Sequence, residues 1–143
     1  MDGAGPVGFL LRIVLAAALV SLAPAVAQAK DPVASPAVQK EFDGFIEKFR
    51  AALKANDPAA VAAMTQLPFM ADKAIGDAAQ FAAKTYRTSF TAKNRACIQR
   101  SKAVYGRDDY KNDYYSVFCG DESVFVFTKT KAGFLFSDIG VND

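Results

Sequence analysis

The stretch SVFVFTKTKAGFLFSDIG, residues 123–140, constrains the fold of this chain more than any other part of the sequence. A strand with one face in water alternates apolar and polar residues, because successive side chains point to opposite faces of the sheet. Here two apolar runs, 124–127 and 134–136, leave no polar face. The sequence therefore predicts two strands of a sheet that is covered on both of its faces.

The N-terminal segment has the pattern of a secretory signal peptide. Arg12 precedes an apolar run, 13–23, which ends at Pro24 and is followed by AQA, a cleavage site that ends at Ala29. The run is well short of the roughly 20 apolar residues that cross a bilayer. We expect cleavage near Ala29, removal of residues 1–29, no stable membrane insertion afterwards, and a protein that is periplasmic or secreted.

Composition describes a globular chain with a single domain, because 52% of the 143 residues are hydrophobic and 22% are charged. The formal net charge of +2 is too small to indicate nucleic-acid binding. The sequence contains no histidine, which removes the commonest general base and the commonest metal ligand. We therefore expect no metal and no cofactor, and any chemistry would depend on Asp, Glu, Tyr, Lys or Cys.

Cys97 and Cys119 are the two cysteines of the chain. In an oxidising compartment, such a pair is more often a structural disulfide than a redox or metal site. Closing the intervening loop stabilises the fold by about 3 kcal/mol in the chain-entropy model. Two free buried thiols are the alternative.

The first helix is predicted from a cap and an apolar stripe. Residues 30–36, KDPVASP, are interpreted as a flexible leader in which Ser35 caps the helix and Pro36 takes its first position. The single domain is expected over residues 37–143. The apolar stripe, at helical spacing, consists of Phe42, Phe45, Ile46, Phe49, Ala52 and Leu53.

Two more helices are predicted before the sheet. Asp57 begins a short one, PAAVAAMT, and Asp77 with Gln80 caps a third, which is expected to end after TAKNRA, residues 91–96. Between them, breaks in helical period favour an extended segment around residues 67–70. The inward face of the third helix is predicted to consist of Ala79, Ala82, Ala83, Tyr86 and Phe90.

From Cys97 onward the pattern becomes typical of strands, with hairpin turns at GDE and TKAG. The expected strands are 98–105, 114–119, 123–128 and 134–139. Helices first and an antiparallel meander last indicate an α+β fold, with three N-terminal helices packed on one face of the sheet.

The segments FIEKFRAALKANDPAAVAAMTQLPF, GDAAQFAAKTYRTSF and YYSVFCGDESVFVFTKTKAGFLFSDIGVND follow one another in an order that covers nearly all of the chain after the signal peptide. With Pro68 and Phe69 after the second helix and Tyr86 in the next, this order resembles small periplasmic members of the nuclear transport factor two-like superfamily. The resemblance implies a cone, in which a curved antiparallel sheet wraps a helical layer. It also implies a homodimer, or another partner, on the second sheet face, and the alternative cover is strong sheet curvature together with the leader.

The same resemblance implies a ligand cavity inside the cone. An aspartate beside phenylalanines is desolvated, which is how carboxylates are adapted for proton transfer, so Asp138 is the candidate catalytic residue. The alternative is a solvated carboxylate near a strand end. The histidine and paired acids of the superfamily's enzymes have no aligned counterpart here. The expected cavity residues are Tyr86, Tyr105, Tyr115, Phe134, Phe136 and Asp138, the last on the same strand face as the two phenylalanines.

A basic stretch runs from Lys84 to Lys111 and holds eight basic and two acidic residues. It could dock an acidic protein, lipopolysaccharide or a cell-wall polymer, and the alternative is a solvated helix end and loop. The candidate patch residues are Arg95, Arg100, Lys102 and Arg107.

These observations favour an exported non-catalytic binding protein, which holds a small apolar ligand in the cone cavity or a protein partner on the sheet face. The second interpretation is a cofactor-independent lyase or isomerase that uses Asp138 and a cavity tyrosine. The third is an accessory or inhibitor protein that acts through the second face of the sheet.

Overall fold

The computed structural model describes residues 3, 18–25, 30–120 and 123–141. The chain forms two units, Met1–Lys30 and Asp31–Asp143. In the first unit, residues 18–25 have neither helix nor strand, and the predicted cleavage point and most of the predicted signal peptide lie outside the described residues. Among the helices that the structure describes, none is long and apolar enough to cross a membrane.

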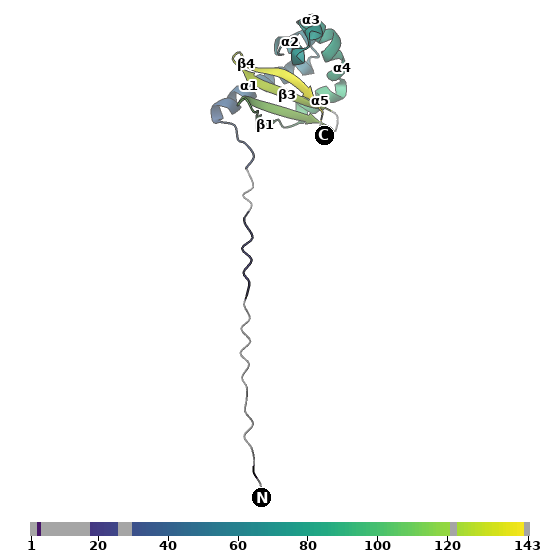
Figure 1. Cartoon of the computed structure of the whole chain (residues 1–143). Coiled ribbons are helices and arrows are strands. Elements are labelled where there is room, and N and C mark those ends of the chain that lie inside the picture. The colour runs from purple at the N-terminus through teal and green to yellow at the C-terminus, as the bar shows by residue number, and fades with distance from the viewer. Residues whose placement is uncertain (1–2, 4–17, 26–29, 121–122, 142–143) are drawn as a thin grey trace. The chain divides into compact units, whose positions relative to one another are not determined.

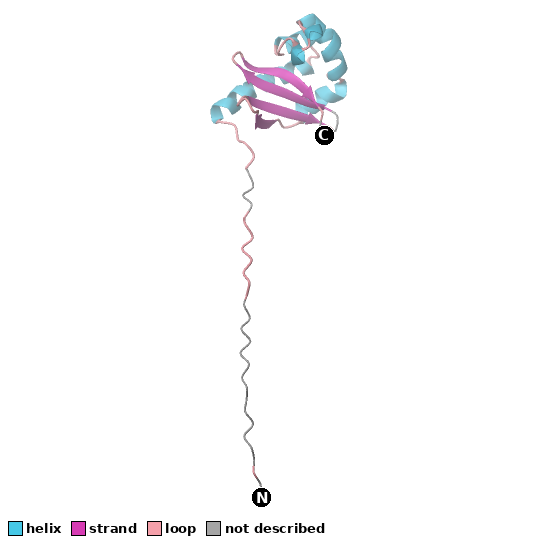
Figure 2. Ribbon diagram, in the orientation of Figure 1, coloured by secondary structure: helices cyan, strands magenta, loops and turns pink. Residues whose placement is uncertain are grey.

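The second unit is an α+β domain whose helices precede an antiparallel sheet (Figure 1). The ribbon in Figure 2 shows the helices gathered on one side of the sheet, which leaves its other side without a helical cover. The predicted α+β class with an antiparallel sheet is therefore confirmed, and the apolar runs 124–127 and 134–136 each contribute side chains to the uncovered side of the sheet.

Helix α1 (Pro36–Lys54) begins where the sequence predicts it. The side chain of Ser35 accepts a hydrogen bond from the Val38 N–H at 3.3 Å, and Pro36 takes the first position. Its predicted apolar stripe faces the sheet, with Phe45 only half-buried and the remaining five residues buried.

Helix α2 (Pro58–Ala63) also begins as predicted, with Asp57 as its cap. The chain that follows then pairs with one edge of the sheet. The Phe136 N–H donates to the Met64 carbonyl and the Gln66 N–H donates to the Phe136 carbonyl, both at 2.8 Å. This pairing satisfies backbone groups that an open sheet edge would otherwise expose.

Two short 3-10 turns, η1 (Phe69–Ala71) and η2 (Lys73–Ile75), follow this pairing. The predicted extended segment around residues 67–70 is therefore wrong in its second half. Met70 and Ala71 adopt left-handed backbone angles, with φ of 52° and 59°, and these angles curl the chain into a turn. Neither residue type signals such a conformation in the sequence.

The third helical run covers residues 78–89 in three parts: α3 (Ala78–Gln80), a π-helical η3 (Phe81–Tyr86) and α4 (Arg87–Ser89). The predicted caps are confirmed. The Asp77 carboxylate accepts from the Gln80 N–H, and the Gln80 side chain accepts from the N–H of the preceding Gly76, both at 2.8 Å.

The inward face of this run differs from the prediction. Tyr86 and Phe90 are buried as expected, whereas Ala79 and Ala83 are exposed and Phe81 is buried in their place. A π-helical turn contains more residues than an α-helical turn, so it rotates the inward face relative to a purely α-helical period.

Helix α5 (Ala92–Arg100) overturns two predictions. The third helix does not continue through residues 91–96, because Thr91 caps a new helix by accepting from the Asn94 N–H at 3.2 Å. Ile98, expected at the start of the first strand, is buried inside this helix. Strand β1 (Val104–Arg107) is correspondingly shorter than predicted.

The other strands, β2 (Asp113–Cys119), β3 (Ser123–Thr130) and β4 (Gly133–Gly140), agree with the predicted ones to within two residues. They form a meander in the order β1-β2-β3-β4, in which all three pairings are antiparallel. A disulfide joins Cys97 in α5 to Cys119 at the end of β2, as the cysteine pattern predicts.

The core lies between the helices and the sheet, and aromatic rings make up the largest part of it. Phe42 stacks on Tyr115 with ring centroids 3.7 Å apart, and Phe49 meets Phe127 edge to face at 4.9 Å. The largest fully buried aromatic side chains are Tyr115, Phe42, Phe49, Phe81, Phe90, Phe125, Phe127 and Phe136.

Candidate functional site

The strand pairing divides the side chains of the sheet between two faces. The core face, which meets the helices, includes Tyr115, Phe125 and Phe127. We call the opposite face the outer face. Its side chains follow from the pairings on that side and are Val104, Tyr114, Ser116, Phe118, Val124, Val126, Thr128, Leu135 and Asp138.

Asp138 lies on the outer face because of an irregularity in β4. Phe127 pairs with Phe136, but Val126 pairs with Asp138, so Ser137 is an extra residue in this strand. Such a β-bulge turns every following side chain to the other face of the sheet. The prediction that Asp138 shares a face with Phe134 and Phe136 is therefore wrong.

The predicted cavity residues do not surround a common hollow. Phe134 and Phe136 are buried in the core, where rings from the helices occupy the space next to them. Phe42 lies with its ring centroid 5.3 Å from that of Phe134, and Phe90 lies at the same distance from Phe136. The space that the sequence assigned to a ligand is filled by aromatic side chains.

The three tyrosines of that predicted set make hydrogen bonds that hold the fold. The hydroxyl of Tyr86 donates to Asn56 at 2.7 Å, and that of Tyr115 donates to Gln39 at 2.9 Å. Burial is the main cause that raises the pKa of both phenols. Neither arrangement leaves a hydroxyl directed at Asp138, which lies across the sheet.

The predicted basic patch is divided among several places. Arg95 donates to the Phe90 carbonyl at 2.7 Å, which closes the end of the third helical run. Arg100 and Lys102 are exposed beside a groove along α1. The four residues therefore do not form one surface.

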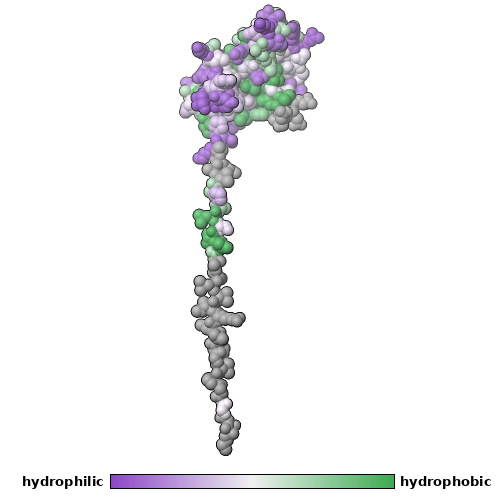
Figure 3. Space-filling view, viewed as in Figure 1, coloured by the Kyte–Doolittle hydropathy of each residue, from purple (hydrophilic) through white to green (hydrophobic). Residues whose placement is uncertain are grey.

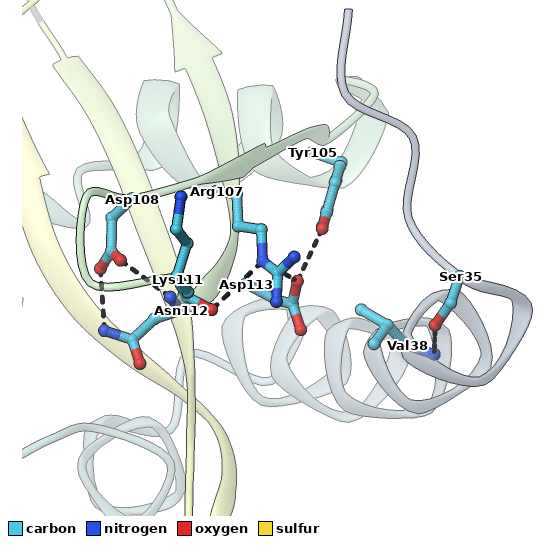
Figure 4. A network of polar contacts seen from close by, with 8 residues as sticks. All are labelled: Ser35, Val38, Tyr105, Arg107, Asp108, Lys111, Asn112 and Asp113. Carbon is cyan, nitrogen blue, oxygen red and sulfur yellow. Dashed lines mark hydrogen bonds and ion pairs between the residues drawn. The ribbon is translucent and has the colours of Figure 1, made fainter.

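Arg107, the fourth residue of that patch, belongs to a polar network at the β1–β2 turn (Figure 4). Its Nε lies 3.7 Å from the Asp113 carboxylate, which also accepts from the Tyr105 hydroxyl at 2.6 Å. This hydrogen bond is the main cause that raises the pKa of Tyr105.

On the other side of the same turn, Asn112 fixes Asp108. The backbone N–H of Asn112 donates to one oxygen of Asp108 at 2.8 Å, and its side-chain amide donates to the other at 2.9 Å (Figure 4). These bonds, the side-chain one first, lower the pKa of Asp108. Asp108 is therefore a carboxylate of fixed position and negative charge beside the outer face.

A pocket of about 480 Å³ lies on the outer face, between this turn and strands β2 to β4. We call it the outer-face pocket. Its described lining contains two carboxylates and no lysine or arginine, so it is acidic. The lining residues are Asp108, Tyr114, Ser116, Val126, Thr128, Ser137 and Asp138.

Two hydroxyl groups of the outer-face pocket donate within the sheet, and one carboxylate oxygen has no donor within the described part of the chain. The hydroxyl of Ser137 donates to the Val126 carbonyl at 3.2 Å, so in its 2.8 Å contact with Thr128 the Thr128 hydroxyl is the donor. Both hydroxyl protons are thereby used inside the sheet. Asp138 Oδ1 is buried and accepts no hydrogen bond from any residue that the structure describes. A buried carboxylate oxygen normally has a donor, so Asp138 would gain a hydrogen bond if its carboxylate turned this oxygen toward a donor that a ligand brings into the pocket.

Exposed apolar side chains lie beside the pocket on the outer face. Val104 and Phe118 are 52% and 44% exposed, whereas Val124, opposite Phe118 in the pairing, is buried. The ring of Tyr114 lies over Gly106, where a Cβ would overlap it, and so covers part of the face. Green, apolar atoms on the side of the sheet turned to the viewer in Figure 3 show the part that stays uncovered.

Sequence patterns did not identify this pocket. Regular alternation along the strand predicts Asp138 on the opposite face, and the charge pattern places Asp108 within a basic stretch. The signal that was available is the pair Asp108 and Asn112, whose spacing suits a turn closed by a side chain. Within the part of the chain that the structure describes, acidic and cysteine side chains form no group that could hold a metal ion.

Comparisons of this chain with protein-family models, with curated proteins and with solved structures find no match. The function is therefore argued from the chemistry of the outer face.

Proposed function

We propose that this protein is an exported, non-catalytic binding protein that holds a protein partner on its outer face, with a basic side chain of the partner in the outer-face pocket. The observation that carries the proposal is the buried Oδ1 of Asp138, which has no donor among the described residues. An ammonium or guanidinium group would supply a charge-assisted hydrogen bond to this oxygen.

The surroundings of Asp138 support a protein as the partner. Protein interfaces combine apolar contacts with a few well-placed polar ones, and contiguous exposed apolar surface often marks such sites. Val104 and Phe118 supply apolar contacts, and Asp108 adds a second negative charge at the pocket. A partner segment with an arginine or lysine flanked by apolar residues complements both features.

Two observations support export. The signal-peptide pattern ends near Ala29, and a disulfide between Cys97 and Cys119 suits an oxidising compartment. The order of the elements, helices followed by an antiparallel meander, supports the proposed membership in the nuclear transport factor two-like superfamily.

A homodimer through the outer face is the second candidate. In a two-fold dimer the same patch meets itself, so two acidic pockets, each with Asp108 and Asp138, would lie in one interface. Like charges that face each other disfavour such a contact. The charge of the pocket therefore favours a different, basic partner over a second copy.

The two site-based alternatives from the sequence have less support. A lyase or isomerase would need Asp138 next to a tyrosine of the expected cavity, but the sheet separates it from Tyr86 and Tyr115. A small ligand inside the cone would need space that Phe42 and Phe90 fill.

Site-specific photo-crosslinking in the producing cell tests the proposal. A photo-reactive amino acid at position 118 samples the outer face, and the same amino acid at position 48, on the exposed side of α1, is the control. We expect a crosslinked protein from position 118 alone, which mass spectrometry identifies. The affinity of the unmodified protein for this partner, once purified, is then measured by calorimetry.

The charge is tested in the same complex. Asp138→Asn should weaken binding about tenfold, because a hydrogen bond between charged groups contributes roughly 1.5 kcal/mol or more. Glu47→Gln on α1 removes the same charge elsewhere and should leave the affinity unchanged. A crosslink between two copies would establish the homodimer instead, and an Asp138→Asn variant that binds normally would refute the role of the pocket.

A further inference from the structure

A second pocket lies on the helical side of the domain, separate from the outer face. It has a volume of about 520 Å³ and is bounded by η1, η2, the outward side of the third helical run and the end of β4. We call it the helix-edge pocket. Its lining includes four apolar side chains and two charged ones: Phe69, Met70, Ile75, Ile139, Asp72 and Lys84. Ile139 pairs with Phe125 and so points away from the outer face.

The backbone at the edge of this pocket is held in an unfavourable conformation. Met70 and Ala71 are consecutive residues with φ of 52° and 59°. This conformation is unfavourable for residues that carry a Cβ, and such residues cluster where ligands are held. Here the conformation leaves Met70 54% exposed beside the pocket. A methionine side chain adapts readily to apolar groups of different shape.

The two charges of the pocket are fixed by one residue, Ala74. The Asp72 carboxylate accepts from the Ala74 N–H, and the Lys84 ammonium donates to the Ala74 carbonyl, both at 2.8 Å. Asp72 keeps a second oxygen and Lys84 keeps two further N–H groups for other partners. A fixed negative and a fixed positive charge therefore lie near each other, beside an apolar hollow.

We propose that the helix-edge pocket binds small zwitterions with an apolar body, namely apolar amino acids and short apolar peptides with free termini. The ligand's ammonium group pairs with Asp72 and its carboxylate with Lys84. Its apolar side chains lie against Phe69, Met70 and Ile139. A ligand with only one charge would leave one of the two protein charges without a partner. This site is independent of the partner surface on the outer face.

Amide NMR of the protein recovered from the periplasm of a bacterial host tests the site, with the dipeptide leucyl-phenylalanine as the probe. We expect saturable shifts at Asp72, Ala74 and Lys84. The same dipeptide with an acetylated N-terminus and an amidated C-terminus keeps the apolar body but has no charge. It should bind more weakly, by up to about 25-fold, because each of two exposed ion pairs contributes up to about fivefold.

Variants assign the charges. Asp72→Asn and Lys84→Gln should each weaken binding of the free dipeptide about fivefold and leave the blocked dipeptide unaffected, which shows that the pocket is intact. The matched controls Asp31→Asn and Lys48→Gln lie outside the pocket and should change neither affinity. The proposal is overturned by an absence of saturable shifts, by shifts on the outer face instead, or by equal affinities for the free and blocked dipeptides.

Discussion

The two faces of the sheet are both apolar in sequence, yet they have different structures. On the core face, phenylalanines at positions 125, 127, 134 and 136 interlock with rings from the helices and are fully or almost fully buried. On the outer face, Phe118, Val126 and Leu135 are partly exposed, and hydroxyl and carboxylate groups lie among them. The helical layer on the core face, more than the hydrophobicity of the strands, therefore distinguishes the face that packs from the face that stays available.

The largest effect should come from the core face. Phe136→Ala removes a fully buried ring that touches Phe49, Phe69 and Phe90, and we expect the free energy of unfolding to fall by about 4 kcal/mol. Phe118→Ala on the outer face should lower it by less than about 1 kcal/mol. Urea unfolding measures both, and equal losses would contradict the difference between the faces.

The disulfide fastens α5 to the core side of the sheet. Replacing Cys97 and Cys119 together by serine should lower the free energy of unfolding by about 3 kcal/mol, because the unfolded chain then regains the freedom of the open loop. Unfolding in urea with and without a reductant gives the measurement. The wild type should lose stability in the reductant, and the double variant, which has no disulfide, should not. If the double variant also loses stability, the reductant acts on the protein by a route other than the disulfide.

Tyr115 makes the core face sensitive to alkali. Its pKa is raised first by burial and then by Asp43, so the folded state binds the phenol proton more tightly than the unfolded state does. The stabilisation that results from this tighter proton binding is complete below the unfolded pKa of about 10, and it is lost as the pH rises through the folded pKa.

Tyr115→Phe keeps the stacked ring and removes the hydroxyl bond to Gln39, so at neutral pH it should cost about 1 kcal/mol. Stability should then decline less steeply above about pH 10 than in the wild type. Urea unfolding across that range tests this, with Tyr110→Phe as an exposed control. Parallel pH profiles for wild type and Tyr115→Phe would show that ionisation of Tyr115 does not contribute.

The smallest effect concerns the outer face. Gly106→Ala places a methyl group where the Tyr114 ring lies, and the ring can swing aside, so we expect a loss of at most about 1 kcal/mol. Gly44→Ala on the exposed side of α1 meets nothing within 4 Å and should stabilise by roughly 0.5–1 kcal/mol. If thermal unfolding shows that Gly106→Ala destabilises the protein and Gly44→Ala stabilises it, the close contact between Gly106 and Tyr114 is supported. Changes of the same sign in both variants would refute it.

Features that depend on local rules could be predicted from the sequence. The caps at Ser35, Asp57 and Asp77 form because a short polar side chain satisfies free N–H groups of its own helix. The strands after residue 113 follow from β-branched and aromatic runs between turns. The π-helical turn at 81–86 has no local pattern, since each of its residues is also suited to an α-helix.

The candidate site depended on side-chain direction, which residue types alone do not supply. The sequence marks Asp138 as unusual but predicts it on the core face, because strict alternation after Phe136 puts it there. The helix-edge pocket was missed entirely. It depends on the left-handed backbone at Met70 and Ala71, which is unfavourable for both residues and is closed by a hydrogen bond from the Asp72 N–H to the Phe69 carbonyl at 2.9 Å.

The bulge at Ser137 sets the register of the last part of β4. If Ser137 paired with Val126 in a regular strand, Asp138 would pair with Phe125 and turn inward among the aromatic rings. If instead the codon for Ser137 were deleted, the aspartate would follow Phe136 directly and would still face Val126 on the outer face. Among related chains, the acidic pocket could therefore persist in a strand that is one residue shorter, and an alignment without a gap would match that aspartate to Ser137 and overlook the equivalence.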